Sequence, residues 1–377
     1  MSPNSTLPSL EPTAPPDVGL GAEHLDAARA VLDSVFGERW PRLVFVSGSL
    51  AAGLGHAWSD VDVYVVDDAG DIESRAYRRG PHTVQINLMT PAAAAAAVST
   101  CTGFVARSDD RTQLEQTEDA VRVAVRLAIA EILHDADGVV PPVQERRTAV
   151  RRLLLGRHAL MVGSYAEDVL GALTSRDPWT ALRSSELALE HGIEAYLTAH
   201  DDLYVGPKFL YRRLARTPGV GTGVAAMWDL LARGDLPTSP EDVTRLVVTR
   251  LRAATLLMAD GILSGFDEPS SSTLGGTTTD GEPEPGTLVT SPWFCPIRFS
   301  NGWGLAGPDR GFRVSGPVVR IWSAFDGSPA DAVLARLGAE DEAFASMPQA
   351  DFHAAVEHLR SIQALTVDPC SLLEERR

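Results

Sequence analysis

The chain has 377 residues, a length that predicts two or three domains rather than a single core. Hydrophobic residues make up 44% of it and charged residues 22%, a composition that excludes wholesale disorder. The formal net charge of −17 disfavours nucleic acid as a partner and suits a small cationic substrate, although excess acid also serves solubility.

The ends and cysteines of the chain predict its compartment. Residues 1–19 are rich in Ser and Pro and lack both a basic start and an apolar run, so we expect a flexible tail rather than a signal peptide. No apolar stretch approaches the roughly 20 residues that a membrane-spanning helix needs. Cys101, Cys295 and Cys370 have no paired spacing, which predicts neither disulfides nor a zinc knuckle. We therefore expect a cytoplasmic protein with no membrane partner.

Residues 20–115 have the pattern of a small α/β domain with a mixed sheet. Apolar residues at helical spacing predict a helix over Ala22–Phe36, and a β-branched and aromatic run predicts a strand at 43–46. Three further strands are predicted, the last two joined as a hairpin: 61–66, 72–79 and 83–89. Pro91 then opens an alanine-rich helix that reaches about Thr100.

Residues 116–264 are predicted to form a helical-bundle domain without strands. Gly and Pro mark the joins between the helical segments, which are 118–134, 143–174, 179–200, 208–217, 224–233 and 240–263. Residues 265–288 consist mostly of Ser, Thr, Gly, Pro and acid, a composition typical of a linker. The remaining unit, 289–370, is long enough for a small domain of its own.

The chemistry is concentrated between residues 44 and 66. A strand leads into Gly48 and Ser49, where a turn and the start of a short helix would expose backbone N–H groups and a hydroxyl to a triphosphate. Asp60 and Asp62 lie two residues apart on the next strand and so share one side of it. Paired carboxylates repel unless a divalent cation lies between them, and Mg²⁺ bound there would bridge to phosphate.

This arrangement resembles the DNA polymerase β-like nucleotidyltransferase superfamily, whose hallmark is Gly-Ser, about ten residues, and then Asp-x-Asp. The resemblance implies that Gly48 and Ser49 bind the nucleotide, that Asp60 and Asp62 are catalytic and hold Mg²⁺ or Mn²⁺, and that ATP is the co-substrate. The bland alternative is that Asp60 caps the strand and Asp62 is a solvated edge charge.

The family often has a third carboxylate on a following strand, and this chain departs from that pattern. Val84 and Ile86 take one face of the strand at 83–89, which leaves Gln85 and Asn87 where the acid would be expected. Either Asn87 completes a weaker metal shell while a carboxylate of the helical domain acts as base, or the site binds nucleotide and catalyses poorly. Antibiotic-modifying members provide a precedent for the first alternative.

Two features of the helical domain are candidates for completing the site, one as a base and one as a contact to triphosphate or substrate. Glu186, Glu190 and Glu194 recur every four residues, and we select Glu190 as the base, although a solvated acidic face also explains the row. The segment around Lys208 resembles the Gly-x-Lys-[WF]-Leu block of aminoglycoside nucleotidyltransferase-like proteins, in which the lysine would reach the triphosphate or the substrate. The alternative is that Lys208 merely decorates a helix start.

The last unit has apolar positions that suit a small winged-helix-like α+β core of three helices with a β-like end. These positions are Val318, Ile321, Trp322, Val333, Leu337, Phe352, Val356 and Leu359. Residues 290–368 look like a PqqD-like peptide-recognition domain, which implies that a carrier or leader peptide adds a strand to its sheet. A structural or dimerisation role is the alternative.

Three functions follow from these patterns. The first is transfer of AMP from ATP to a hydroxyl of a small, aminated acceptor such as an antibiotic. The second is the same chemistry in peptide natural-product biosynthesis, and the third is a non-catalytic nucleotide-binding regulator. The oligomeric state stays open, although related two-domain transferases often form homodimers to complete the cleft.

Overall fold

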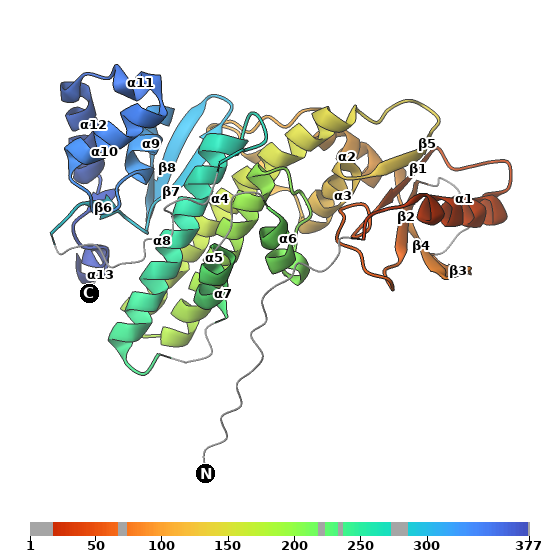
Figure 1. Cartoon of the computed structure of the whole chain (residues 1–377), viewed down its shortest axis with the longest axis horizontal. Coiled ribbons are helices and arrows are strands. Elements are labelled where there is room, and N and C mark those ends of the chain that lie inside the picture. Colours follow the sequence, from red (N-terminus) through yellow and green to blue (C-terminus); the bar gives the residue numbers. More distant parts are fainter. Residues whose placement is uncertain (1–17, 67–73, 218–222, 233–236, 273–285, 376–377) are drawn as a thin grey trace, which may run out of the picture.

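The computed structural model of the chain describes residues 18–66, 74–217, 223–232, 237–272 and 286–375. Most of the predicted tail, the predicted strand start at Ile72 and linker residues 273–285 lie outside the described residues. The molecule is elongated, with a sheet-based part at one end, a helical bundle in the middle and a second α/β part at the other end (Figure 1). Within the described residues, no helix is long and apolar enough to cross a membrane.

The first part contains a five-stranded mixed sheet, as the sequence predicts. Its order is β3-β4-β2-β1-β5, and β2 and β4 run parallel while the other neighbours are antiparallel. The strands are β1 (Leu43–Ser47), β2 (Val61–Val66), β3 (Arg75–Arg79), β4 (His82–Met89) and β5 (Glu131–Asp135). Antiparallel pairing of β3 with β4 confirms the predicted hairpin over the described residues.

Helices cover the two faces of this sheet differently. α1 (Ala22–Phe36) has the predicted bounds and packs Val31 and Leu32 against Val63 and Ile86. Phe45 and other residues of the opposite face share a core with α2 (Pro91–Thr102) and α3 (Glu118–Ala128). Alternation along each strand therefore separates a sealed face under α1 from the face that carries Asp62.

Strand β5 corrects the helix predicted over 118–134. α3 ends at Ala128, and β5 pairs antiparallel with β1, Phe45 lying opposite Ile132. Without β5, β1 would leave a row of backbone N–H and C=O groups unpaired at the edge of the sheet. This long-range pairing outweighs the local helical periodicity, so the first sheet draws on residues of the region expected to be purely helical.

The turn after β1 corrects a second expectation. Residues 50–55 form hydrogen-bonded turns rather than a short helix, with Ala52 N donating to Gly48 O at 3.1 Å and Leu54 N to Ser49 O at 2.7 Å. Gly48 and Gly53 have φ values of 91° and 69°, in the left-handed region that a right-handed helix cannot contain. A phosphate at this turn would therefore meet N–H groups of the turn and no helix dipole.

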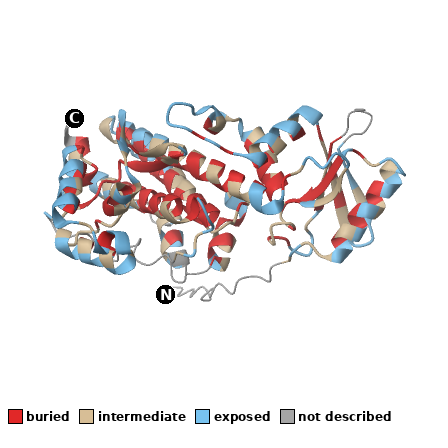
Figure 2. Ribbon diagram, turned by 90° about the horizontal axis from the view of Figure 1, so that it is seen from above, coloured by how far each residue is buried: buried red, intermediate tan, exposed pale blue. Residues whose placement is uncertain are grey.

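The middle of the molecule is a bundle built on three long helices, α4 (Val143–Thr174), α5 (Pro178–Ala199) and α8 (Pro240–Gly265). The shorter elements are η1 (Thr112–Glu115), η2 (Pro207–Phe209), α6 (Leu210–Arg216) and α7 (Gly223–Leu231). Gly192 lets α5 approach α8, because a Cβ there would lie 2.7 Å from the backbone of Ala254. Figure 2 shows the buried residues that line the interior of the bundle.

The C-terminal part has a three-stranded antiparallel sheet followed by helices. The strands are β7 (Cys295–Phe299), β8 (Gly302–Gly307) and β9 (Arg310–Val314), and the helices are α9 (Gly316–Ser323), α10 (Ala330–Glu340), α11 (Glu342–Ala345), α12 (Gln349–Ser361) and α13 (Ser371–Glu375). A short pair, β6 (Val289–Thr290) with β10 (Leu365–Thr366), forms the predicted β-like end. Trp322, Val333 and Phe352 are fully buried, as expected of this core.

Candidate active site

Two carboxylates lie where β2 begins. Asp62 is half-buried on the sheet face opposite α1, and Asp60, the residue just before the strand, is exposed. Burial raises the pKa of Asp62 above its ordinary value, the negative charge of Asp60 adds to the rise, and Arg126 opposes it. A raised pKa means that burial disfavours the charged form of this carboxylate, and a cation placed beside Asp60 and Asp62 would relieve that cost.

The turn after β1 passes directly over Asp62. A Cβ built on Gly48 would lie 2.2 Å from Oδ2 of Asp62, so only glycine fits there, and its positive φ requires glycine as well. The hydroxyl of the buried Ser47 donates to the carbonyl oxygen of Arg126 at 2.7 Å, which ties the end of β1 to α3. Ser49 is partly exposed beside this contact. The geometry thus places Gly48 against Asp62, with Ser49 next to Gly48 in the turn.

Asn87 occupies the place expected for a third carboxylate. Parallel pairing sets Asp62 opposite Gln85 and Tyr64 opposite Asn87, on neighbouring strands. The Asn87 side chain hydrogen-bonds to Asp62, and its Nδ2 also donates to the carbonyl oxygen of Gln85 at 3.4 Å. As a hydrogen-bond donor to Asp62, the amide orients that carboxylate without adding charge.

Arg126 belongs to this site and was not predicted. Its positive charge lowers the pKa values of Asp62 and Tyr64 against the larger opposing effect of burial, and its guanidinium lies 5.1 Å from the ring centroid of Tyr204. Within the described chain, Nη1 of Arg126 is buried and has no hydrogen-bond partner. Arg122 and Arg126 are four residues apart on α3, a spacing that is visible in the sequence. The sequence does not show that α3 packs against the sheet, because α3 was expected to belong to a separate helical domain.

The donor set fits a hard divalent cation only in part. Asp60 and Asp62 offer carboxylate oxygens, which Mg²⁺ prefers, and Mg²⁺ commonly takes one or two carboxylates and fills its other positions with water and phosphate oxygens. Among the described residues, no cluster of three or more His, Cys, Asp or Glu side chains could hold a metal ion. The residues therefore suit a metal that arrives with a phosphate ligand better than one held by protein alone.

Helix α6 of the bundle donates side-chain hydrogen bonds to backbone carbonyls of the turn. Nη1 of Arg212 donates to the carbonyl oxygens of Leu54 and Gly55 at 3.0 and 3.1 Å. Nη1 of Arg216 donates to the carbonyl oxygen of Ala52 at 2.8 Å. Because these arginines bind turn carbonyls, the bundle fixes the conformation of the segment that carries Gly48 and Ser49.

The row of glutamates on α5 is not the solvated face that one alternative expected. Glu194 is buried and accepts from Nη1 of Arg213 at 2.8 and 2.9 Å, and Glu186 lies 3.3 Å from Nη1 of Arg250. Glu190 has no hydrogen-bond or ion-pair partner among the described residues, and burial raises its pKa. Glu190 also lines a pocket of about 360 Å³ between α3, α4 and α5.

Lys208 lies in η2, at an exposed position. Its Nζ lies 4.9 Å from the ring centroid of Phe209, the one contact described for it. It is the only lysine in the sequence, and all other residues in the combined count of Lys and Arg are arginines. The structure does not join Lys208 to Asp60 or Asp62 through a described contact, so its role at a triphosphate stays a prediction.

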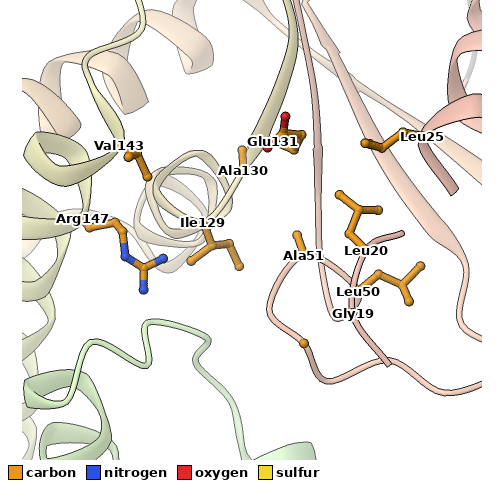
Figure 3. Close-up of a pocket in the computed structure, with 11 residues that line it drawn as sticks. Gly19, Leu20, Leu25, Leu50, Ala51, Ile129, Ala130, Glu131, Val143 and Arg147 are labelled. Atoms are coloured by element: carbon orange, nitrogen blue, oxygen red, sulfur yellow. The ribbon is translucent and has the colours of Figure 1, made fainter. Parts of the chain in front are cut away.

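A second cavity, of about 530 Å³, lies on the other side of the turn (Figure 3). Leu50 and Ala51 of the turn, Ile129 after α3 and Arg147 of α4 line it from different sides. Arg147 is engaged by Asp201, to which its Nε donates at 2.7 Å. The turn therefore borders a cavity between the first sheet and the bundle.

Comparisons with known proteins give limited information. No family model matches the chain, and no curated protein matches it. A solved structure of a nucleotidyltransferase-like protein from Exiguobacterium sibiricum is similar over 63% of this chain and 78% of that one, with 10% identity and a TM-score of 0.35. Similarity this low carries no conclusion, and function has to be argued from the site itself.

Proposed function

We propose that the chain is a metal-dependent nucleotidyltransferase that moves a nucleoside monophosphate, most simply AMP from ATP, onto a hydroxyl of a small molecule. The observation that carries this proposal is the close approach of Gly48 to Asp62. The glycine turn after β1 is held against a half-buried carboxylate that has a second carboxylate two residues away. Phosphate and a divalent cation are the ligands that these two features take together.

Each residue has a distinct task in this reaction. Asp60 and Asp62 would hold Mg²⁺ or Mn²⁺, which supplies charge stabilisation to the α-phosphate and the departing pyrophosphate. Backbone N–H groups at Gly48 and the Ser49 hydroxyl bind phosphate oxygens. The partnerless Nη1 of Arg126 gains an acceptor when a phosphate oxygen reaches it, which offsets the cost of its burial.

The base comes from the bundle. The acceptor oxygen forms a bond to the α-phosphorus, the bond from that phosphorus to pyrophosphate breaks, and the hydroxyl proton passes to Glu190. A base must be free to accept a proton, and Glu190 has no partner among the described residues, whereas Glu194 is paired with Arg213. Its raised pKa brings it closer to working pH, which strengthens it as a base.

The test is a transfer assay that detects products by mass. The chain is incubated with mixed nucleoside triphosphates, Mg²⁺ and a library of hydroxylated small molecules and peptides. We expect a product heavier by one nucleoside monophosphate, and a loss of at least about 100-fold in rate for an Asp60→Asn/Asp62→Asn variant, the scale of removing a key charge from an active site. An Asp26→Asn/Asp168→Asn variant removes two exposed carboxylates and serves as the matched control. Equal rates for the two double variants would refute the proposal.

The same assay separates the alternatives. Strand β9 forms one edge of the C-terminal sheet and exposes Arg310 and Arg313, an edge to which a leader or carrier peptide could add a strand. Products found on peptides alone favour the natural-product role. Asn87 in place of an acid favours the regulator, for which metal-dependent ATP binding without turnover across the whole library is the expected result.

A further inference from the structure

The pocket that contains Glu190 is separate from the carboxylate pair but adjoins it. α3 contributes Val121 to the pocket wall and, further along the same helix, Arg126 to the carboxylate site. The chain after α5 does the same, because Tyr204 lies against Arg126 while the next residue, Val205, lines the pocket. Two segments, α3 and the chain after α5, therefore connect the pocket with the site at Asp62.

The charge of the pocket wall is lower than its residue types suggest. The Glu118 carboxylate accepts from Nη2 of Arg157, and Glu194 is neutralised by Arg213 at 2.8 Å. Glu194 also accepts from the backbone N–H of Gly206 at 3.1 Å. Among the described lining residues, Glu190 is thus the one carboxylate without a partner. A single free negative charge suits a small acceptor with one positive charge better than a polycation.

The rest of the wall is apolar and aromatic. Leu154 and Met161 of α4 and Leu210 of α6 line it, and the Tyr165 ring stacks on His191 with centroids 5.7 Å apart and planes 17° from parallel. A volume of about 360 Å³ is at the lower end of the range of small-molecule sites. The pocket therefore accommodates an apolar body about the size of one or two rings.

A histidine pair fixes the hydrogen-bonding character of the pocket. Nδ1 of His158 and Nδ1 of His191 lie 3.0 Å apart, so one ring must donate to the other. Nε2 of His158 is buried and has no partner in the described chain. A buried N–H without an acceptor costs more than a buried lone pair of a neutral ring, so His158 carries its proton on Nδ1 and donates to His191.

This tautomer determines what His191 offers. With Nδ1 accepting, the neutral ring carries its proton on Nε2, which has no partner among the described residues although the ring lines the pocket. Burial lowers the pKa of His191 to about 4, so the ring is neutral at pH 7. The pocket then presents one N–H donor from His191 and one carboxylate from Glu190, on neighbouring positions of α5.

We infer that this pocket binds the acceptor, and that the acceptor is a small amphiphilic alcohol carrying at most one positive charge. Its hydroxyl or amine lies at the end that meets Glu190 and Nε2 of His191, and its apolar body lies against Leu154, Met161 and Tyr165. That the bound molecule is the acceptor of the transfer rests on the proposed function. That it is a small amphiphilic alcohol rests on the pocket alone.

The probe is trans-4-aminocyclohexanol, a single apolar ring with one hydroxyl and one ammonium group. Its binding is followed by NMR of ring-labelled histidines in the full chain, with the His191 signal assigned from a His191→Gln variant. A fragment of about eight heavy atoms is expected to bind with a Kd on the order of 1 mM and to shift the His191 signal. Glucosamine, equally charged but polar all round, is expected to bind at least about tenfold more weakly, since it cannot use the apolar wall.

Variants test which groups the probe meets. Glu190→Gln should weaken binding about tenfold, and Glu167→Gln, the same change at an exposed position of α4, should have no effect. His191→Gln places an amide near the former Nε2 and should retain binding within about threefold. His191→Asn places it near Nδ1 and should lose about tenfold. No shift at His191, glucosamine binding as tight as the probe, or equal effects of the two glutamate changes would overturn the inference.

A parallel titration with ATP and Mg²⁺ separates this inference from the proposed function. If ATP binds and the probe does not, the acceptor pocket is wrong while the nucleotide site stands. If the probe binds and ATP does not, the proposed function is wrong while the pocket stands as a binding site for amphiphilic alcohols.

Discussion

At the residue scale, neighbouring residues restrain the Asp62 side chain, a restraint that the Asp-x-Asp motif alone does not imply. Gly48 passes over its Oδ2, and the Asn87 side chain hydrogen-bonds to it. Burial then disfavours the charge that this geometry orients. This restraint against an electrostatic cost distinguishes Asp62 from a solvated edge carboxylate, which would show neither feature.

The buried histidines predict an acid-dependent loss of stability. His191 has a pKa of about 4 in the folded chain against 6.5 in the unfolded one, so the unfolded state binds more protons between these values. The stability that the neutral ring contributes is complete above pH 6.5 and is lost as pH falls toward 4. Urea unfolding should show that the wild type loses about 2–3 kcal/mol more than His191→Gln between pH 7 and pH 4.5. Equal losses would contradict a neutral, buried ring.

Sequence patterns identified some site residues and missed others for physical reasons. Gly48, Ser49 and Asp62 could be proposed from the sequence because the turn, the spacing and the strand alternation are local features of the chain. Arg126 was missed because its approach to Asp62 depends on the packing of α3 against the sheet. The pairing of Glu194 was equally hidden, since its partner Arg213 comes from another helix. Charges in a sequence do not reveal which of them are paired.

At the element scale, a continuous set of ion pairs joins α5 to the turn. Glu194 pairs with Arg213, Arg213 donates from Nε to Asp202 at 3.0 Å, and Asp202 accepts from Arg216. Arg216 in turn holds the carbonyl oxygen of Ala52. The pocket wall and the turn after β1 are thus positioned by one network of ion pairs and hydrogen bonds.

Breaking this network should be costly, and replacing it less so. Arg213→Met leaves Glu194 buried without its cation and should lower the free energy of unfolding by about 3–5 kcal/mol. Adding Glu194→Leu removes the stranded charge, so the double variant should be more stable than Arg213→Met alone. Arg122→Met, at an exposed position, should change stability by less than about 0.5 kcal/mol. A double variant less stable than Arg213→Met would show that the buried Glu194 carboxylate does not need the Arg213 cation to be stable.

Local elements were predicted well and long-range pairing was not. The bounds of α1 and α4 follow from apolar periodicity and from Gly and Pro at the joins, and both are as predicted. β5 was read as helix because its strand partner, β1, is far away in sequence. The helix expected after Gly48 failed because left-handed glycines end the right-handed conformation there. Pairing partners and backbone handedness are decided by contacts that periodicity does not record.

At the scale of the whole molecule, the C-terminal part is joined to the bundle and is not a tethered appendage. Strand β7 packs against α4 and α8, and the Cys295 thiol donates to the carbonyl oxygen of Ala159 in α4 at 3.4 Å. Phe266, at the start of the predicted linker, is buried, and Asp267 pairs with Arg298 of β7 at 2.7 Å. The sheet-based part and the C-terminal part therefore lie at fixed, opposite ends of the bundle (Figure 1).

This arrangement limits the roles open to the C-terminal sheet. In Figure 1 the C-terminal sheet, marked by β7 and β8, lies at the other end of the molecule from β2, the strand that contains Asp62, so a peptide bound at that sheet could reach the carboxylates only through an extended segment. Deletion of the whole part would expose the faces of α4 and α8 that β7 covers, and would not report on recruitment alone. Substitutions on β9 are the informative changes.

The most direct test of the central claim is calorimetric binding of an ATP analogue with a methylene group between the α- and β-phosphates, with and without Mg²⁺. We expect a Kd between about 1 μM and 1 mM that requires Mg²⁺, in the range of ordinary enzyme–substrate affinities. We also expect a loss of at least about 100-fold for Asp60→Asn/Asp62→Asn and no loss for Asp26→Asn/Asp168→Asn. Binding that needs no Mg²⁺, or that survives removal of both Asp60 and Asp62, would contradict the nucleotide site.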